Sequence, residues 1–239
     1  MNRWLTPLIT FIFPAKCRRC ETPMGVGKVH YLCDDCWEQI ETLKPPWCQI
    51  CGLPCWSAVC ADCREHLPLF GRLRAIAFYE PTLREAVHLM KYEKKQVISK
   101  HLIQLLRAHL PEDLASTGYD FLLPIPLHTN RLRQRGFNQA EQIAQGIAQV
   151  WGVPVRTDIL FRIRDTVPLS SLESHEERRK NIAGAFEVRS PDFIQNQKIL
   201  LIDDIFTTGI TINEALKVLQ VGNPDCIDVL TLTRTRPLL

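Results

Sequence analysis

The residues best suited to chemistry lie near the C-terminus, where two carboxylates and several threonines follow an apolar run. Residues 199–202 are Ile, Leu, Leu and Ile, the composition of a buried strand, and Asp203 and Asp204 come directly after them. Carboxylates accept hydrogen bonds from adjacent sugar hydroxyls. A glycine that lets backbone N–H groups approach, together with a helix start, favours a phosphate. The pattern therefore predicts a site for a phosphorylated sugar, with these phosphate-binding residues: Thr207, Thr208, Gly209 and Thr211.

A purely structural interpretation of the same segment is also open. Thr211 and Glu214 fit a capping box, and an Asp-Asp turn can simply start a helix. That interpretation does not explain why two acids follow an apolar strand or why three threonines flank a glycine. The chain contains neither G-x-x-x-x-G-K-[ST] nor G-x-G-x-x-G, which excludes an NTPase P-loop and argues against a dinucleotide site.

The cysteines form the second chemical cluster. Nine of the ten lie between residues 17 and 63, and eight of these form C-x-x-C pairs. Two such pairs complete one tetrahedral zinc site, so two structural zinc ions are expected, with free buried thiols or redox pairs as the alternative. We favour pairing in sequence order, although alternate pairs could also be joined, and Cys55 is a spare thiol. The expected ligands are Cys17, Cys20, Cys33, Cys36, Cys48, Cys51, Cys60 and Cys63.

Net charge gives no ground for a general affinity for nucleic acid. The formal charge of +3 falls to about −1 once eight thiolates and two zinc ions are counted. Local basic clusters remain possible phosphate anchors. They are Arg131, Arg133 and Arg135, and Arg178, Arg179 and Lys180, the second of which a solvated helix face explains equally well.

An apolar run at residues 5–13 superficially resembles a secretory signal. It is too short to span a bilayer, contains Pro7 and leads straight into Cys17 without a small-residue cleavage site. We expect a short helix packed on the protein, no stable membrane insertion, and a cytoplasmic location in which clustered cysteines bind metal.

From residue 69 onward, strand and helix patterns alternate, which predicts an α/β domain with a mostly parallel sheet. We therefore place a zinc module at residues 1–68 and the α/β domain at 69–239. An arginine-rich loop is expected at 128–137 and a polar lid at 164–180. Strands are expected at 73–79, 121–126, 155–163, 186–188, 199–202 and 226–232, and helices at 81–90, 97–110, 138–150 and 212–219.

The segment 199–211 closely resembles the ribose-phosphate signature of type I phosphoribosyltransferases, which bind 5-phosphoribosyl 1-pyrophosphate (PRPP). With the four C-x-x-C pairs and further matching segments, nearly the whole chain is similar to the ComF family of competence-associated proteins. The further segments are Phe78-Tyr-Glu80, Met90-Lys-Tyr92, Leu123-Pro-Ile-Pro-Leu127, Arg135-Gly-Phe-Asn-Gln139, Glu177-Arg178 and Asn181-Ile-Ala-Gly-Ala-Phe186.

The resemblance implies a zinc-finger module joined to a phosphoribosyltransferase fold. It implies that Asp203 and Asp204 contact the ribose, and we take them as the candidate catalytic pair. The residues 207–209 and 211 would hold the 5-phosphate, and Arg131 and Arg135 would face pyrophosphate carried with Mg²⁺. Lys91 could contact a phosphate, but we favour its interpretation as a solvated helix-face lysine. One departure is Leu169, where the family pattern usually has glutamine.

Three functions fit this reading. The first is transfer of a phosphoribosyl group to a nitrogen acceptor that the sequence does not identify. The second is non-catalytic handling of single-stranded DNA during uptake, with the PRPP site as a sensor or docking pocket. The third is a vestigial site kept for folding, against which the intact Asp203, Asp204 and threonine loop argue. The sequence specifies no oligomeric state.

Overall fold

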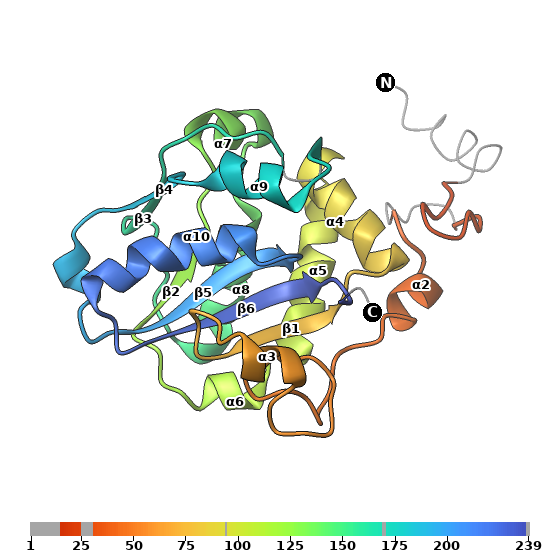
Figure 1. The fold of residues 1–239 in the computed structure, drawn as a ribbon. Coiled ribbons are helices and arrows are strands. Elements are labelled where there is room, and N and C mark those ends of the chain that lie inside the picture. Colours follow the sequence, from red (N-terminus) through yellow and green to blue (C-terminus); the bar gives the residue numbers. More distant parts are fainter. Residues whose placement is uncertain (1–14, 25–30, 94, 169–170, 238–239) are drawn as a thin grey trace.

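The core of the molecule is a four-stranded sheet in which every neighbouring pair of strands is parallel. The computed structural model describes residues 15–24, 31–93, 95–168 and 171–237, so the helix expected at residues 5–13 and Leu169 lie outside the described residues. The expected α/β class with a parallel sheet is confirmed (Figure 1). In spatial order the strands are β1 (Leu73–Phe78), β6 (Cys226–Arg234), β5 (Lys198–Phe206) and β2 (Phe121–Pro124).

Both faces of the sheet are covered by helices, which explains why β5 is apolar at consecutive positions. Leu200 and Ile202 pack into the cluster that holds the long helices of one face, whereas Ile199 and Leu201 pack against the helix of the other. The helices concerned are α4 (Pro81–Glu93), α5 (Gln96–Ala108), α8 (Gln139–Trp151) and α10 (Ile210–Leu219). Figure 1 shows α10 on one side of the sheet and α4, α5 and α8 on the other.

Two predicted irregular segments contain helices. The arginine-rich segment 128–137 forms α7 (Thr129–Arg135), which ends at Gly136 with a φ of 86°. The polar segment 164–180 leads into α9 (His175–Ile182), whose first turn is fixed by a capping box between Ser174 and Glu177. Neither helix carries an apolar stripe, because α7 buries no residue and α9 buries only Ile182. Hydrophobic periodicity could not detect them.

The remaining elements are short. A two-stranded antiparallel sheet joins β3 to β4 beside the main sheet. The bounds are α2 (Asp34–Glu38), α3 (Ala61–Glu65), α6 (Glu112–Ala115), β3 (Leu160–Arg162), β4 (Phe186–Val188), η2 (Pro191–Ile194) and η3 (Gln220–Gly222). Within the described residues, no helix combines the length and hydropathy that crossing a bilayer requires.

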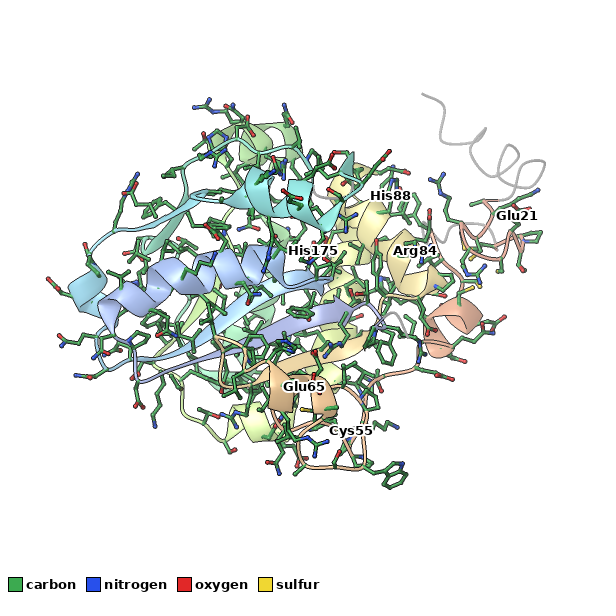
Figure 2. All side chains as sticks on the ribbon, viewed as in Figure 1. Glu21, Cys55, Glu65, Arg84, His88 and His175 are labelled. Carbon is green, nitrogen blue, oxygen red and sulfur yellow. The ribbon has the colours of Figure 1, made fainter. Side chains whose placement is uncertain are left out.

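The N-terminal cysteine region packs along the β1 side of the sheet. Thr42 pairs with Ala77 of β1, and the Leu43 N–H donates to the Ile76 carbonyl at 2.7 Å, which covers the exposed edge of that strand. The part that follows has a small hydrophobic cluster of its own beside α3, where Figure 2 marks Cys55 and Glu65. The N-terminal region is therefore built onto the α/β core by backbone pairing.

Candidate functional site

Eight cysteines form two compact clusters, in the sequential pairing that we expected. Within each cluster the four sulfur atoms lie within 4.8 Å of one another, and Cys55 belongs to neither. Its Sγ instead lies 3.0 Å from the Ser57 carbonyl. The first cluster comprises Cys17, Cys20, Cys33 and Cys36, and the second Cys48, Cys51, Cys60 and Cys63.

The geometry of both clusters fits a tetrahedral zinc ion. Four thiolates about 2.3 Å from zinc stand about 3.8 Å apart. The Sγ–Sγ distances are 3.8 Å for Cys17–Cys36, 3.5 Å for Cys20–Cys33 and 3.7 Å for Cys51–Cys60. Backbone N–H groups also point at the sulfurs, as the Cys33 N–H does toward Cys17 at 3.3 Å. These outer contacts stabilise thiolates and orient them, so each cluster can hold one structural zinc.

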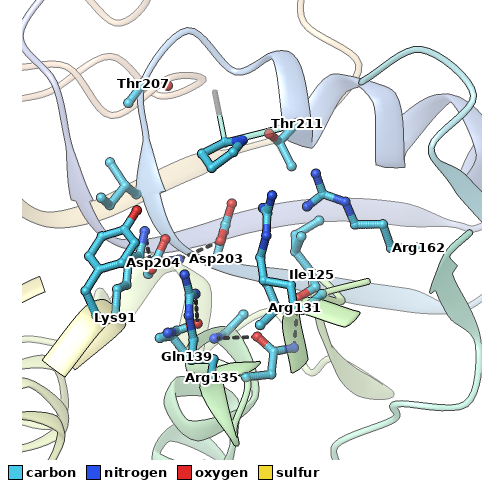
Figure 3. Close-up of a pocket in the computed structure, with 16 residues that line it drawn as sticks. Lys91, Ile125, Arg131, Arg135, Gln139, Arg162, Asp203, Asp204, Thr207 and Thr211 are labelled. Atoms are coloured by element: carbon cyan, nitrogen blue, oxygen red, sulfur yellow. Dashed lines mark hydrogen bonds and ion pairs between the residues drawn. The ribbon is translucent and has the colours of Figure 1, made fainter. Parts of the chain in front are cut away.

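A separate cavity of about 210 Å³ lies at the carboxyl ends of β2 and β5. Its lining combines two acids, four cations and two threonines, drawn from elements far apart in the sequence (Figure 3). In open α/β sheets ligands bind at this end of the strands. The charged and hydroxyl-bearing residues that line it are Lys91, Arg131, Arg135, Arg162, Asp203, Asp204, Thr207 and Thr211.

The two carboxylates differ in their surroundings. β5 runs on to Phe206, since β6 continues beside it, so Asp203 and Asp204 lie within the strand and their side chains leave opposite faces. Asp204 is buried and pairs with Lys91 of α4, with 2.6 Å between Nζ and Oδ2. Our interpretation of Lys91 as a solvated helix-face residue was wrong, because α4 directs it into the cavity.

Asp203 carries no such cationic partner among the described residues. Burial, and then the neighbouring charge of Asp204, raise the pKa of Asp203 to about 7. Its Oδ1 accepts the Asp204 N–H at 2.8 Å. We therefore expect the carboxyl of Asp203 to take up or release a proton near neutral pH. Of the two acids, Asp203 is the one that is free to interact with a ligand.

Three arginines crowd the opposite wall. Arg131 and Arg135 lie four residues apart on α7 and so share one helix face, whereas Arg133 is exposed and does not line the cavity. Arg162 comes from β3 and was not predicted. Burial, and then the charge of Arg131, lower the pKa of Arg162 to about 10. Cations held this close repel one another, which favours an anionic ligand between them.

Two buried polar atoms of the cavity lining have no hydrogen-bond partner among the described residues. They are Nε of Arg162 and Nε2 of Gln139, a residue that is only 2% exposed. The other end of the Gln139 amide accepts from Arg135 Nη1 at 2.7 Å, which fixes which way the amide faces. Buried donors without acceptors are uncommon in proteins, so these two side chains beside the cavity are not fully satisfied by the described residues.

The threonine loop closes the cavity at the N-terminus of α10. Gly209 begins the helix at a φ of 72°, and no side chain caps it, so the structural interpretation of Thr211 with Glu214 was wrong. Glu214 instead accepts the Gly184 N–H at 2.7 Å. The free N–H groups of the first turn, with Thr207 and Thr211, can therefore serve an anion. Thr208 faces a neighbouring hollow instead, beside Ile210 and Lys217.

The structure thus gathers most of the predicted site residues. Asp203, Asp204, Thr207, Thr211, Arg131 and Arg135 line one cavity, while Thr208 and Gly209 do not line it. The sequence missed Arg162 and Gln139. The Arg135-Gly-Phe-Asn-Gln139 segment contained a signal for Gln139, but nothing local marks Arg162, which β3 brings in by tertiary folding.

Comparisons with known proteins agree with the N-terminal assignment. Residues 8–64 match the family described as the double zinc ribbon domain. Relatives along most of the chain include "DNA utilization protein YhgH" of Salmonella typhi, which is 29% identical over 228 residues. The match covers 93% of this chain and 98% of the relative.

Two further relatives carry competence names. "Competence protein F" of Haemophilus influenzae is 28% identical, with 93% of this chain and 98% of the relative covered. "Competence protein ComFC" of Streptococcus pneumoniae is 30% identical, with 85% and 87% covered. A solved glutamine phosphoribosylpyrophosphate amidotransferase of B. subtilis, complexed with ADP and GMP, matches 49% of this chain and 24% of its own at 16% identity. Its TM-score of 0.33 is too low to support any conclusion.

Proposed function

Since this chain belongs to the ComF family of competence proteins, we propose that its cavity binds PRPP as a magnesium complex and that the protein is a phosphoribosyltransferase. It would transfer or exchange the phosphoribosyl group at a nitrogen acceptor. In this proposal residues 1–68 are the zinc module and residues 69–239 the phosphoribosyltransferase-like domain. The reduced thiolates of two zinc sites favour a cytoplasmic location.

The observation that carries the proposal is the imbalance of charge around the cavity. Four cationic side chains face two carboxylates, one carboxylate is already paired with Lys91, and Arg162 and Gln139 in the lining each keep a buried donor that has no partner among the described residues. A ligand with several anionic oxygens would satisfy these groups, and a sugar would suit the remaining carboxylate. PRPP combines both, because it carries phosphate groups at both ends of a ribose.

The elements that form the cavity suggest the orientation of the ligand. The 5-phosphate would lie against Thr207, Thr211 and the first turn of α10. Asp203 would accept from the ribose hydroxyls. The diphosphate would face Arg131, Arg135 and Arg162, and Mg²⁺ would neutralise part of its charge.

The chain's own groups could then promote the reaction by position and charge. A carboxylate at Asp203 stabilises positive charge that develops on the sugar, and the arginines stabilise the departing diphosphate. Lys91 holds Asp204 in place and limits the number of free negative charges beside the ligand. No side-chain nucleophile is required.

The test is titration of PRPP with Mg²⁺ by calorimetry. We expect the wild type to bind and an Asp203→Asn/Asp204→Asn protein to bind at least about tenfold more weakly, since charged hydrogen bonds contribute about 1.5–3 kcal/mol each. Asp158→Asn is the matched control, because Asp158 pairs with Arg156 on the surface and does not line the cavity. Equal affinities of wild type and double variant would contradict the assignment. Release of pyrophosphate with a panel of bases tests turnover.

A second candidate is a protein that handles single-stranded DNA and uses the PRPP site as a sensor. It is favoured by the names of the relatives, which refer to DNA utilization and competence. The second basic cluster supports it weakly, because Lys180 pairs with Glu176 and Arg178 donates to the Leu172 carbonyl. PRPP binding without pyrophosphate release, together with salt-dependent binding of a labelled single strand, would favour this candidate over the transferase.

A further inference from the structure

The second four-cysteine cluster is fixed to the α/β core by its own backbone. The Leu73 N–H of β1 donates to the Ile50 carbonyl at 2.7 Å, and Arg74 Nη2 donates to the Gln49 carbonyl at 2.9 Å. The approach is so close that a Cβ on Gly52 would lie 2.4 Å from the Leu73 carbonyl oxygen. The segment 48–52 is therefore packed directly against strand β1.

Arg234, the last residue of β6, makes the next contact. It is only 5% exposed, and its Nη1 donates to the carbonyl of Cys51, a residue of the second cluster. A zinc ion with four thiolates carries a net charge of −2. Arg234 therefore supplies positive charge beside the second cluster, whereas the buried Arg74 is paired with Asp113, with 2.6 Å between Nη2 and Oδ2. Negative charge on the thiolates would help to explain how the guanidinium of Arg234 can be buried there.

The guanidinium of Arg234 also lies over the ring of Phe206, 5.4 Å from its centroid. On another side Phe70 meets the same ring edge-on at 6.4 Å. Phe206 is the final residue of β5 and stands directly behind the threonine loop. A Cβ on Gly209 would come within 2.9 Å of its Cζ, so the ring and the loop backbone are already in contact.

We propose that the second zinc site positions the phosphate-binding loop, acting through Arg234 and Phe206 as positioning residues. This inference rests on the proposed function, since it assigns the loop to the 5-phosphate of the ligand. The first cluster lacks this path among the described residues, because its Cys17 and Cys36 pack into the core formed with α4 and α5. Loss of the second zinc site should therefore affect ligand binding at the threonine loop in a way that loss of the first site does not.

The test uses Arg234→Met, with ribose 5-phosphate and inorganic pyrophosphate titrated separately in the presence of Mg²⁺. Removing the guanidinium frees the ring and the loop. We expect ribose 5-phosphate to bind about five- to tenfold more weakly, the loss of roughly one hydrogen bond, while the affinity for pyrophosphate stays unchanged. Arg234→Lys, which retains a charge and a donor, should recover part of the affinity. Equal weakening of both ligands would overturn the proposal, because it would indicate general damage.

Phe206→Leu provides a second variant in case Arg234→Met does not fold. It keeps an apolar residue at the position but removes the ring behind Gly209, and it should give the same selective loss. Trp37→Leu is the matched control, since this ring stacks on His101 at 5.4 Å beside the first cluster and lies outside the cavity. A selective loss in Trp37→Leu would contradict the proposed path.

Hydrogen exchange of the ligand-free proteins separates this inference from the proposed function. Arg234→Met should lose protection at the amides of residues 207–212, and Trp37→Leu should not. Unchanged protection in Arg234→Met would overturn the coupling even if the wild type binds PRPP. Failure of the wild type to bind ribose 5-phosphate, pyrophosphate and PRPP would instead overturn the proposed function, while the exchange result would still decide the coupling.

Discussion

Asp203 and Asp204 are neighbours in the sequence but have different surroundings in the cavity and, in our proposal, different roles. Asp204 is paired with Lys91, whereas burial and the charge of Asp204 raise the pKa of Asp203 to about 7. A neutral carboxyl cannot stabilise a cation. We therefore assign to Asp203 the protein's contribution to the pH dependence of ligand binding near neutral pH.

This assignment predicts how the affinity for PRPP with Mg²⁺ depends on pH. For one proton with a pKa of about 7, affinity should rise about tenfold between roughly pH 6 and pH 8. The ligand-free protein should show the opposite trend in stability, since a raised aspartate pKa makes folding less favourable as pH rises from about 4 to about 7. Calorimetry at several pH values measures the first effect. Asp203→Asn is the control, because in this variant only the ionisable groups of the ligand and of the rest of the protein still titrate. If the variant showed the same dependence of affinity on pH as the wild type, the assignment would be contradicted.

Gly209 gives a second prediction at the level of one residue. Its φ of 72° and its contact with Phe206 both disfavour a Cβ, whereas Gly118 has a φ of 67° with nothing within 4 Å of a Cβ. Each change to alanine should cost about 1 kcal/mol in backbone strain. Only Gly209→Ala should also weaken binding of ribose 5-phosphate. Denaturant unfolding and calorimetry on the two variants check both parts, and equal ligand affinities would argue against the loop as the phosphate site.

At the level of elements, α7 decides which arginines reach the ligand. A helical repeat places Arg131 and Arg135 on the cavity side and leaves Arg133 in solvent. Arg135→Gln should weaken pyrophosphate binding by about 10- to 100-fold, as expected for loss of a charged hydrogen bond, and Arg133→Gln should leave it unchanged. Titration of pyrophosphate into both variants is the measurement. Similar losses in both would mean that the segment acts as a diffuse basic surface.

The same helix shows what the sequence could and could not predict. Strand β6 and helices α4 and α8 have apolar patterns, and the sequence located them closely. The apolar part of β5 was also located, but the strand continues to Phe206, because its last residues pair with β6 although they are not an apolar run. The polar α7 and α9 were missed, since their helical form depends on local capping and not on burial. The threonine loop was predicted from local chemistry. Lys91 and Arg162 could not be assigned, because their places depend on where α4 and β3 pack around the sheet.

At the level of the whole molecule, the two cysteine clusters join different cores. Cys17 and Cys36 pack with the core that contains α4 and α5. Helix α4 carries Lys91, which lines the cavity. The second cluster shares Ile50 with the core that contains α10. The N-terminal module thus packs against both cores of the α/β domain, and metal binding should contribute to the stability of that domain as well as to its own.

Zinc content tests this description directly. Elemental analysis should find two zinc ions per chain in the wild type and in Cys55→Ser, because Cys55 lies outside both clusters. Replacing Cys17 and Cys20 together, or Cys48 and Cys51 together, should leave one, since each pair belongs to a single cluster. If zinc sites stabilise both cores, a strong chelator should lower the melting temperature of the whole chain in one cooperative transition. A transition of the α/β domain that does not respond to chelation would instead show that the module only adjoins the domain, and that its metal contributes nothing to the domain's stability.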